Sequence, residues 1–136
     1  MLIQKLNEAI NTLDELITLT QNDIKNIKIA NHDAVFANTL KKEELAEKFF
    51  RLKSEIDEIL VRRNKSIEEI FSQEEEKIFN IFREKLNEFY IIHKRFSKLA
   101  LSVANFYNTL LVKIKNEKPI DYSQKSPYNS TLKLKA

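Results

Sequence analysis

The residues best suited to acid–base or metal chemistry are the two histidines, His32 and His93. His93 lies between Phe89 and Phe96 at helical spacing. The sequence has no HExxH motif, and no glutamate three residues before His93 that would add a metal ligand from the same helix. A lone histidine among apolar residues more often sets the register of packed helices. His32 is expected at a turn, where a capping role is favoured.

Other catalytic arrangements also find little support. The chain has no cysteine and no glycine, which excludes thiolate metal sites and recognisable glycine-rich phosphate loops or nucleophile elbows. Two histidines offer little for a Ser–His–Asp triad. Glu74–Glu76 suit the first turn of a helix, where carboxylates meet the positive end of the dipole. We therefore expect no enzymatic activity, no cofactor and no metal site. The alternative is a helical enzyme that uses buried arginine and glutamate side chains, but no motif in the sequence points to it.

The composition favours long amphipathic helices, with 43% apolar and 32% charged residues. Apolar residues that alternate at spacings of three and four predict helices over about 3–30, 33–64 and 72–116. We expect an all-α, antiparallel, coiled-coil-like bundle of three helices in one domain, 1–116.

In the turn before the third helix, two capping boxes compete, Ser66 with Glu69 and Ser72 with Glu75. The core face predicted for the second helix is Phe36, Leu40, Leu45, Phe49, Leu52, Ile56 and Ile59.

The predicted third helix carries a wider apolar face than a two-helix seam requires. Two series of apolar residues run along it one position apart. The second of them is Phe89, Ile92, Phe96, Leu99, Val103, Phe106 and Leu110. One interpretation is ordinary core, because two partner helices can cover a broad stripe. The other is an exposed groove that receives a partner helix. The third helix is the longest, which favours the groove.

Residues 117–136 are predicted to form a flexible tail, because they follow helical periodicity no longer and contain both prolines. The net charge of the chain is +3, and lysines outnumber acidic residues in the tail. A basic tail could contact nucleic acid or an acidic protein, but a solubilising role is the simpler interpretation. We expect no nucleic-acid binding, because the aromatic residues follow the core period. Without a signal-like start or a long apolar run, we expect a cytoplasmic protein without membrane insertion.

The order of these segments resembles that of the FlgN-type flagellar export chaperones. The resemblance rests on a first helix with leucine heptads and on the segment NHDAVFANTLKKEELAEKFFRLKSEIDEIL, which includes the pair Lys42 and Glu43. A long third helix and a polar tail with tyrosines complete it. It implies a small chaperone of type III secretion in the bacterial flagellum. Such a chaperone holds the C-terminal helices of hook-associated proteins and delivers them to the cytoplasmic domain of the export gate.

The excess apolar width of the third helix then predicts the client-binding residues, together with nearby residues of the first helix. They are Phe96, Leu99, Val103, Phe106 and Leu110. By position, the resemblance gives the export-gate contact to Tyr122 rather than to Tyr128. The family often has glycine shortly after this tyrosine, whereas Tyr122 is followed by Ser123, Gln124 and Lys125. The alternative is a structural coiled-coil protein that self-assembles. The sequence does not identify the client or the resting oligomeric state.

Overall fold

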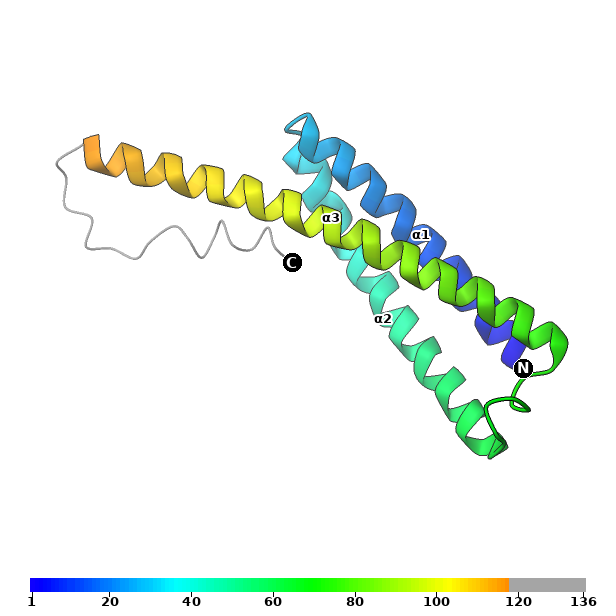
Figure 1. Cartoon of the computed structure of the whole chain (residues 1–136). Coiled ribbons are helices and arrows are strands. Elements are labelled where there is room, and N and C mark those ends of the chain that lie inside the picture. The colour runs from blue at the N-terminus through cyan, green and yellow to red at the C-terminus, as the bar shows by residue number, and fades with distance from the viewer. Residues whose placement is uncertain (118–136) are drawn as a thin grey trace. The chain divides into compact units, whose positions relative to one another are not determined.

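The computed structural model of the chain describes residues 1–117, which form three α-helices (Figure 1). These are α1 (Leu2–Lys28), α2 (His32–Arg63) and α3 (Gln73–Glu117). The described residues contain no strand. The predicted all-α fold is confirmed, and every helix begins and ends within two residues of its predicted bound. The flexible tail was predicted for residues 117–136. Those beyond Glu117 lie outside the described part of the chain, so the tail stays a prediction.

The chain divides into two compact units, Met1–His93 and a second unit that begins at Lys94. The first unit contains α1, α2 and the first part of α3. The second contains the remainder of α3, which continues as regular helix to Glu117. A single bundle domain over 1–116 stays a prediction.

The core of the first unit joins all three helices. α1 and α2 form an antiparallel hairpin, and the first part of α3 packs on it (Figure 1). The Phe49 and Phe82 rings stack with centroids 6.1 Å apart, which ties α2 to α3. An ion pair of 2.8 Å between Lys85 and Asp14 ties α3 to α1 at the surface. The buried cluster comprises Leu2, Leu6, Ala9, Leu13, Phe49, Leu52, Ile56 and Phe82.

The face that α2 turns to this core differs from the predicted one at its N-terminal end. Phe36 and Leu40 were predicted to be core residues, but they are 53% and 66% exposed, so the prediction is wrong at both positions. The α2 residues that face α1 instead follow one unbroken heptad spacing. They are Val35, Asn38, Lys42, Leu45, Phe49, Leu52 and Ile56.

A polar layer lies in the seam between α1 and α2. Asp23 of α1 is only 1% exposed. Its two carboxylate oxygens accept hydrogen bonds of 2.9 Å, one from the side-chain amide of Asn38 and one from the Lys42 ammonium. A buried carboxylate needs such partners, because burial without them would cost several kcal/mol. The layer therefore fixes the register of the hairpin.

The turn between α1 and α2 is a helix-ending Schellman motif without glycine. The Asn31 N–H donates to the Asn26 carbonyl at 2.8 Å, and the Ala30 N–H donates to the Ile27 carbonyl at 3.0 Å. Ala30 has φ of 59°, in the left-handed region that usually takes glycine. Asn31 is the N-cap residue of α2, but its side chain makes no capping hydrogen bond.

The turn between α2 and α3 resolves the competition between the two capping boxes. The Glu75 N–H donates to the Ser72 hydroxyl at 3.2 Å, and the Ser72 N–H donates to the Glu75 carboxylate at 3.0 Å. Ser66 and Glu69 are joined only by a backbone turn. Arg63 donates two hydrogen bonds, of 2.6 and 2.7 Å, to the Glu75 carboxylate. The capping box that starts α3 is thus fastened to the end of α2.

Candidate partner-binding site

The five residues predicted to bind a client fall into three environments along α3. Phe96 is buried, at 4% exposed. Leu99 and Val103 are half-buried. Phe106 is 60% exposed, and Leu110 is also exposed. The face that is covered at Phe96 is therefore open to solvent from Phe106 onward, so the accessible surface lies in the C-terminal part of the predicted site.

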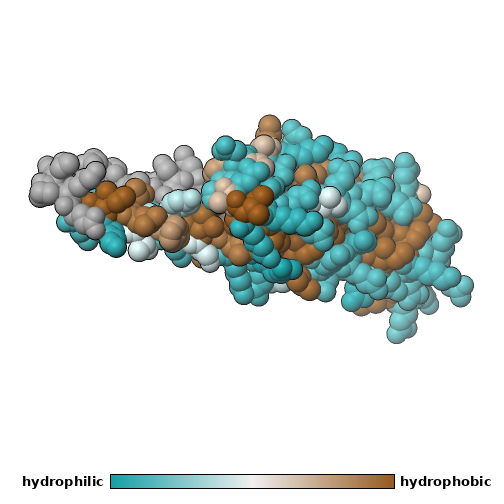
Figure 2. Space-filling view, turned by 90° about the horizontal axis from the view of Figure 1, so that it is seen from above, coloured by the Kyte–Doolittle hydropathy of each residue, from teal (hydrophilic) through white to brown (hydrophobic). Residues whose placement is uncertain are grey.

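Apolar exposure is concentrated in this last part of α3. The exposed apolar residues here are Leu101, Phe106, Tyr107, Leu110, Leu111, Val112 and Ile114. In Figure 2, brown side chains follow one another along the part of α3 next to the grey residues. The Phe106 and Tyr107 rings meet edge to face, with centroids 5.7 Å apart. A contiguous exposed apolar surface of this kind usually marks an interaction site.

The charges around this surface have one sign. No acidic residue occurs between Glu88 and Glu117. The run from Leu99 to Val112 has no charged residue of either sign, and it spans about 20 Å of helix. The exposed basic residues lie on both sides of that run, at Lys94, Arg95, Lys98 and Lys113.

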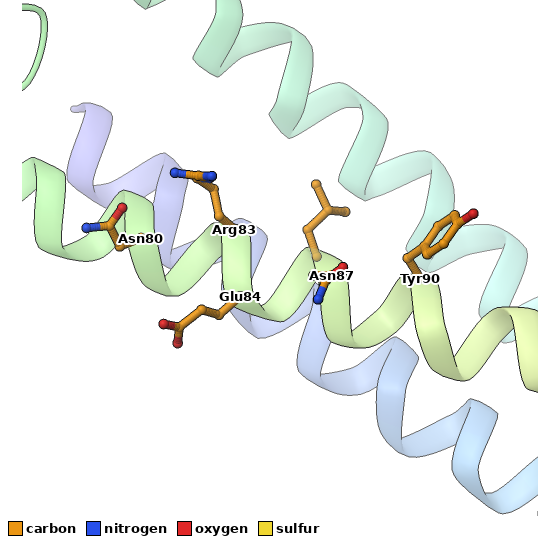
Figure 3. A pocket seen from close by; sticks show the side chains of 6 residues that line it. Asn80, Arg83, Glu84, Asn87 and Tyr90 are labelled. Atoms are coloured by element: carbon orange, nitrogen blue, oxygen red, sulfur yellow. The ribbon is translucent and has the colours of Figure 1, made fainter. Parts of the chain in front are cut away.

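A shallow hollow on the first part of α3 offers no comparable site. It is lined by Asn80, Arg83, Glu84, Leu86, Asn87 and Tyr90. Figure 3 shows that the labelled side chains come from one helix and point in different directions, with Glu84 directed away from Arg83 and Tyr90. Because no two reactive groups converge on one point, this arrangement does not support acid–base chemistry.

His93, the residue considered first for chemistry, is more exposed than a seam position predicts. Its ring lies 5.5 Å from the Phe89 ring. Partial burial, followed by the positive charge of Lys42, lowers its pKa below the usual value. No group of acidic residues and histidines that could hold a metal ion occurs among residues 1–117.

Comparison of the chain with protein-family models, curated proteins and solved structures found no match. None of the three described helices combines the length and the apolar character needed to cross a membrane. The resemblance to export chaperones thus rests on the sequence pattern alone.

Tyr122, the predicted export-gate contact, and Tyr128 lie outside the described residues.

Sequence reasoning missed the polar layer around Asp23, although a signal was present. Asp23 continues the heptad series of α1 that passes through Leu13, Leu16 and Thr20. An aspartate at such a position requires a cation or an amide opposite it. Lys42 was noted only as part of a charged pair with Glu43.

Proposed function

We propose that this chain is a non-enzymatic helical chaperone that binds an amphipathic helix of a client protein along the exposed part of α3. The observation that carries the proposal is the exposure of Phe106 and Leu110 on a face that is buried at Phe96. A helix with a matching apolar stripe would bury these side chains in a helix-on-helix contact.

The resemblance to FlgN-type chaperones gives the proposal its biological content. In that proposal the client is a hook-associated protein, held by its C-terminal helix in the cytoplasm before flagellar export. Tyr122 then contacts the cytoplasmic domain of the export gate while α3 holds the client. An aromatic ring suits this contact, because it buries a large area at low entropic cost.

The test compares Phe106→Ala with Phe82→Ala in a titration against C-terminal peptides of hook-associated proteins. Phe106 is exposed and Phe82 belongs to the buried cluster. We expect Phe106→Ala to weaken binding by about 1–3 kcal/mol and to leave the thermal midpoint nearly unchanged. Phe82→Ala should cost about 3–5 kcal/mol of folding stability. A similar loss of stability in Phe106→Ala would place Phe106 in the core and refute the proposal.

The alternative function, a self-assembling coiled-coil protein, uses the same exposed residues of α3. The two functions differ in stoichiometry. A chaperone forms a defined complex with one client helix, whereas a structural protein forms homo-oligomers that grow with concentration. Tyr122→Ala, with Tyr128→Ala as its control, separates them further, because only the chaperone should lose export-gate binding while it keeps its client.

A further inference from the structure

The exposed surface of α3 carries information about the charge of its partner. Arg95 and Lys113 are separated by a whole number of helical turns, so they lie on the same side of α3. Phe106 lies between them on that side, close to three turns after Arg95 and two turns before Lys113. Leu99 and Leu110 flank it at heptad spacing. One side of the helix thus presents an uncharged and mainly apolar stretch, which includes Ser102 beside Phe106 and ends in a cation at each end.

This arrangement resembles the core and rim of a protein interface. Interface cores are poor in charge and rich in aromatic residues, while charged residues lie at the rim. Phe106 and Tyr107 lie in the uncharged run, and Arg95 and Lys113 lie beyond its ends. Carboxylates opposite both ends would complement these cations and would reject partners of the same sign.

From this pattern, and resting on the proposed function, we infer that the partner is an amphipathic helix whose apolar stripe is bounded at both ends by aspartate or glutamate. The apolar stripe of that helix would have to match the side of α3 from Leu99 to Leu110. Its acidic residues would lie opposite Arg95 at one end and opposite Lys113 at the other.

A second copy of this chain fits the surface less well. A parallel copy would bring Arg95 beside Arg95 and Lys113 beside Lys113. An antiparallel copy would bring Arg95 beside Lys113. Both pairings place like charges together, and no carboxylate between Glu88 and Glu117 is present to relieve them. The residues beyond Glu117 are also rich in lysine, which disfavours them as cover for the same side.

An anionic lipid surface fits less well for a different reason. Helices that lie on membranes carry lysine and arginine along their polar face. Between Lys98 and Lys113 this segment has no such residue, and its polar side chains, among them Ser102, Asn105 and Thr109, are uncharged. The cations lie at the two ends, which suits a partner of limited length rather than a continuous surface.

The experiment uses the full chain and three labelled helical peptides. The peptides share one alanine- and leucine-rich apolar core and carry two glutamates, two glutamines or two lysines at each end. Fluorescence anisotropy gives Kd at low and at high salt. We expect the glutamate peptide to bind at least about tenfold more tightly than the lysine peptide at low salt. The difference should shrink at high salt, because exposed charges are screened.

A charge-reversed protein supplies the decisive comparison. Arg95→Glu/Lys113→Glu should bind the lysine peptide more tightly than the glutamate peptide. Lys65→Glu/Lys94→Glu is the matched control, since it changes the net charge equally at exposed positions away from this side of α3. The control should keep the preference of the wild type.

The possible outcomes separate this inference from the function on which it rests. Equal affinity for all three peptides, weakened by Phe106→Ala, would overturn the charge rule and leave the chaperone proposal standing. Failure to bind any peptide would count against both. Tighter binding to phosphatidylglycerol vesicles than to the glutamate peptide would overturn the inference in favour of a membrane surface. Self-association that Phe106→Ala abolishes would overturn it in favour of a second copy.

Discussion

At the scale of single residues, Ala30 holds a backbone conformation that its side chain disfavours. Its φ of 59° costs a residue with a Cβ about 1–2 kcal/mol. We expect Ala30→Gly to stabilise the protein by about 0.5–1 kcal/mol. Glycine removes the strain from the folded state, and this gain exceeds the free energy by which its greater chain entropy stabilises the unfolded state. The midpoint of urea unfolding measures the effect.

Asn64 is the natural control for that substitution. It ends α2 with φ of 48°, but asparagine tolerates the left-handed region. Asn64→Gly should therefore change stability less than Ala30→Gly. A lower urea midpoint for Ala30→Gly than for the wild type would contradict the assignment of strain to this turn.

Glu75 links the start of α3 to the end of α2 through its charge. The hydrogen bonds from Arg63, more than any other interaction, lower the pKa of Glu75 to about 2. The folded-state pKa thus lies below the unfolded value of about 4.3. The contribution to stability is complete above roughly pH 5 and is lost as the pH falls towards 2. We expect Glu75→Gln to cost about 1–3 kcal/mol near neutral pH.

The pH profile of unfolding distinguishes this role from a general effect of lost charge. Glu76→Gln is the matched control, because Glu76 is an exposed neighbour in the same first turn. The free energy of unfolding of Glu75→Gln should fall less between pH 5 and 2 than that of the wild type or the control. Three parallel profiles would show that the Arg63–Glu75 pair does not contribute.

At the scale of helices, periodicity predicted the three elements well, because each apolar series runs for several turns. It failed in the first turns of α2, where apolar content and register disagree. Phe36 and Leu40 are the larger apolar residues, yet they are exposed. Val35 continues the register that Phe49 and Ile56 impose farther along the helix. A rotation of α2 that buried Phe36 and Leu40 would have moved Phe49 and Ile56 out of the core. The helix keeps its register instead, and Asn38 and Lys42 meet Asp23 in the polar layer.

The polar layer of Asp23, Asn38 and Lys42 gives a prediction for the α1–α2 hairpin. Asp23→Ala leaves the largely buried Lys42 ammonium without this carboxylate, so we expect a loss of about 3 kcal/mol. The double substitution Asp23→Leu/Lys42→Leu should recover most of that loss, because a buried ion pair is often no more stabilising than apolar residues. Chemical denaturation of the three proteins measures both effects. A double variant as unstable as Asp23→Ala would contradict this view.

The candidate site was predictable only in part. The apolar series through Phe96 and Phe106 was visible in the sequence, and so was its excess width. The series could not show that Phe96 is buried while Phe106 is exposed, because periodicity identifies a face and not what covers it. The absence of acidic residues around that face was equally visible, but it gains meaning only once the exposed part is known.

At the scale of the whole molecule, the division at His93 and Lys94 predicts two levels of local stability. The first unit has a core shared by three helices. The second unit has many exposed apolar side chains, and a helical segment with little tertiary packing opens more readily than a packed one. In hydrogen exchange followed by mass spectrometry, we expect amides of 106–114 to exchange at least about tenfold faster than those of 82–92. The residues of α1 near Leu6 and Leu13 should be slowest.

Partner binding should change that pattern in one place. A helix bound along Leu99–Leu110 would exclude water from the exposed apolar side and lower the frequency of opening. Saturation with the partner should therefore slow exchange in 99–114, with little effect on residues 2–60. Phe106 is exposed, so Phe106→Ala should reduce the slowing at the same partner concentration without changing exchange in the core. Protection that instead appears in α1 and α2, with 99–114 unchanged, would move the binding surface to the first unit.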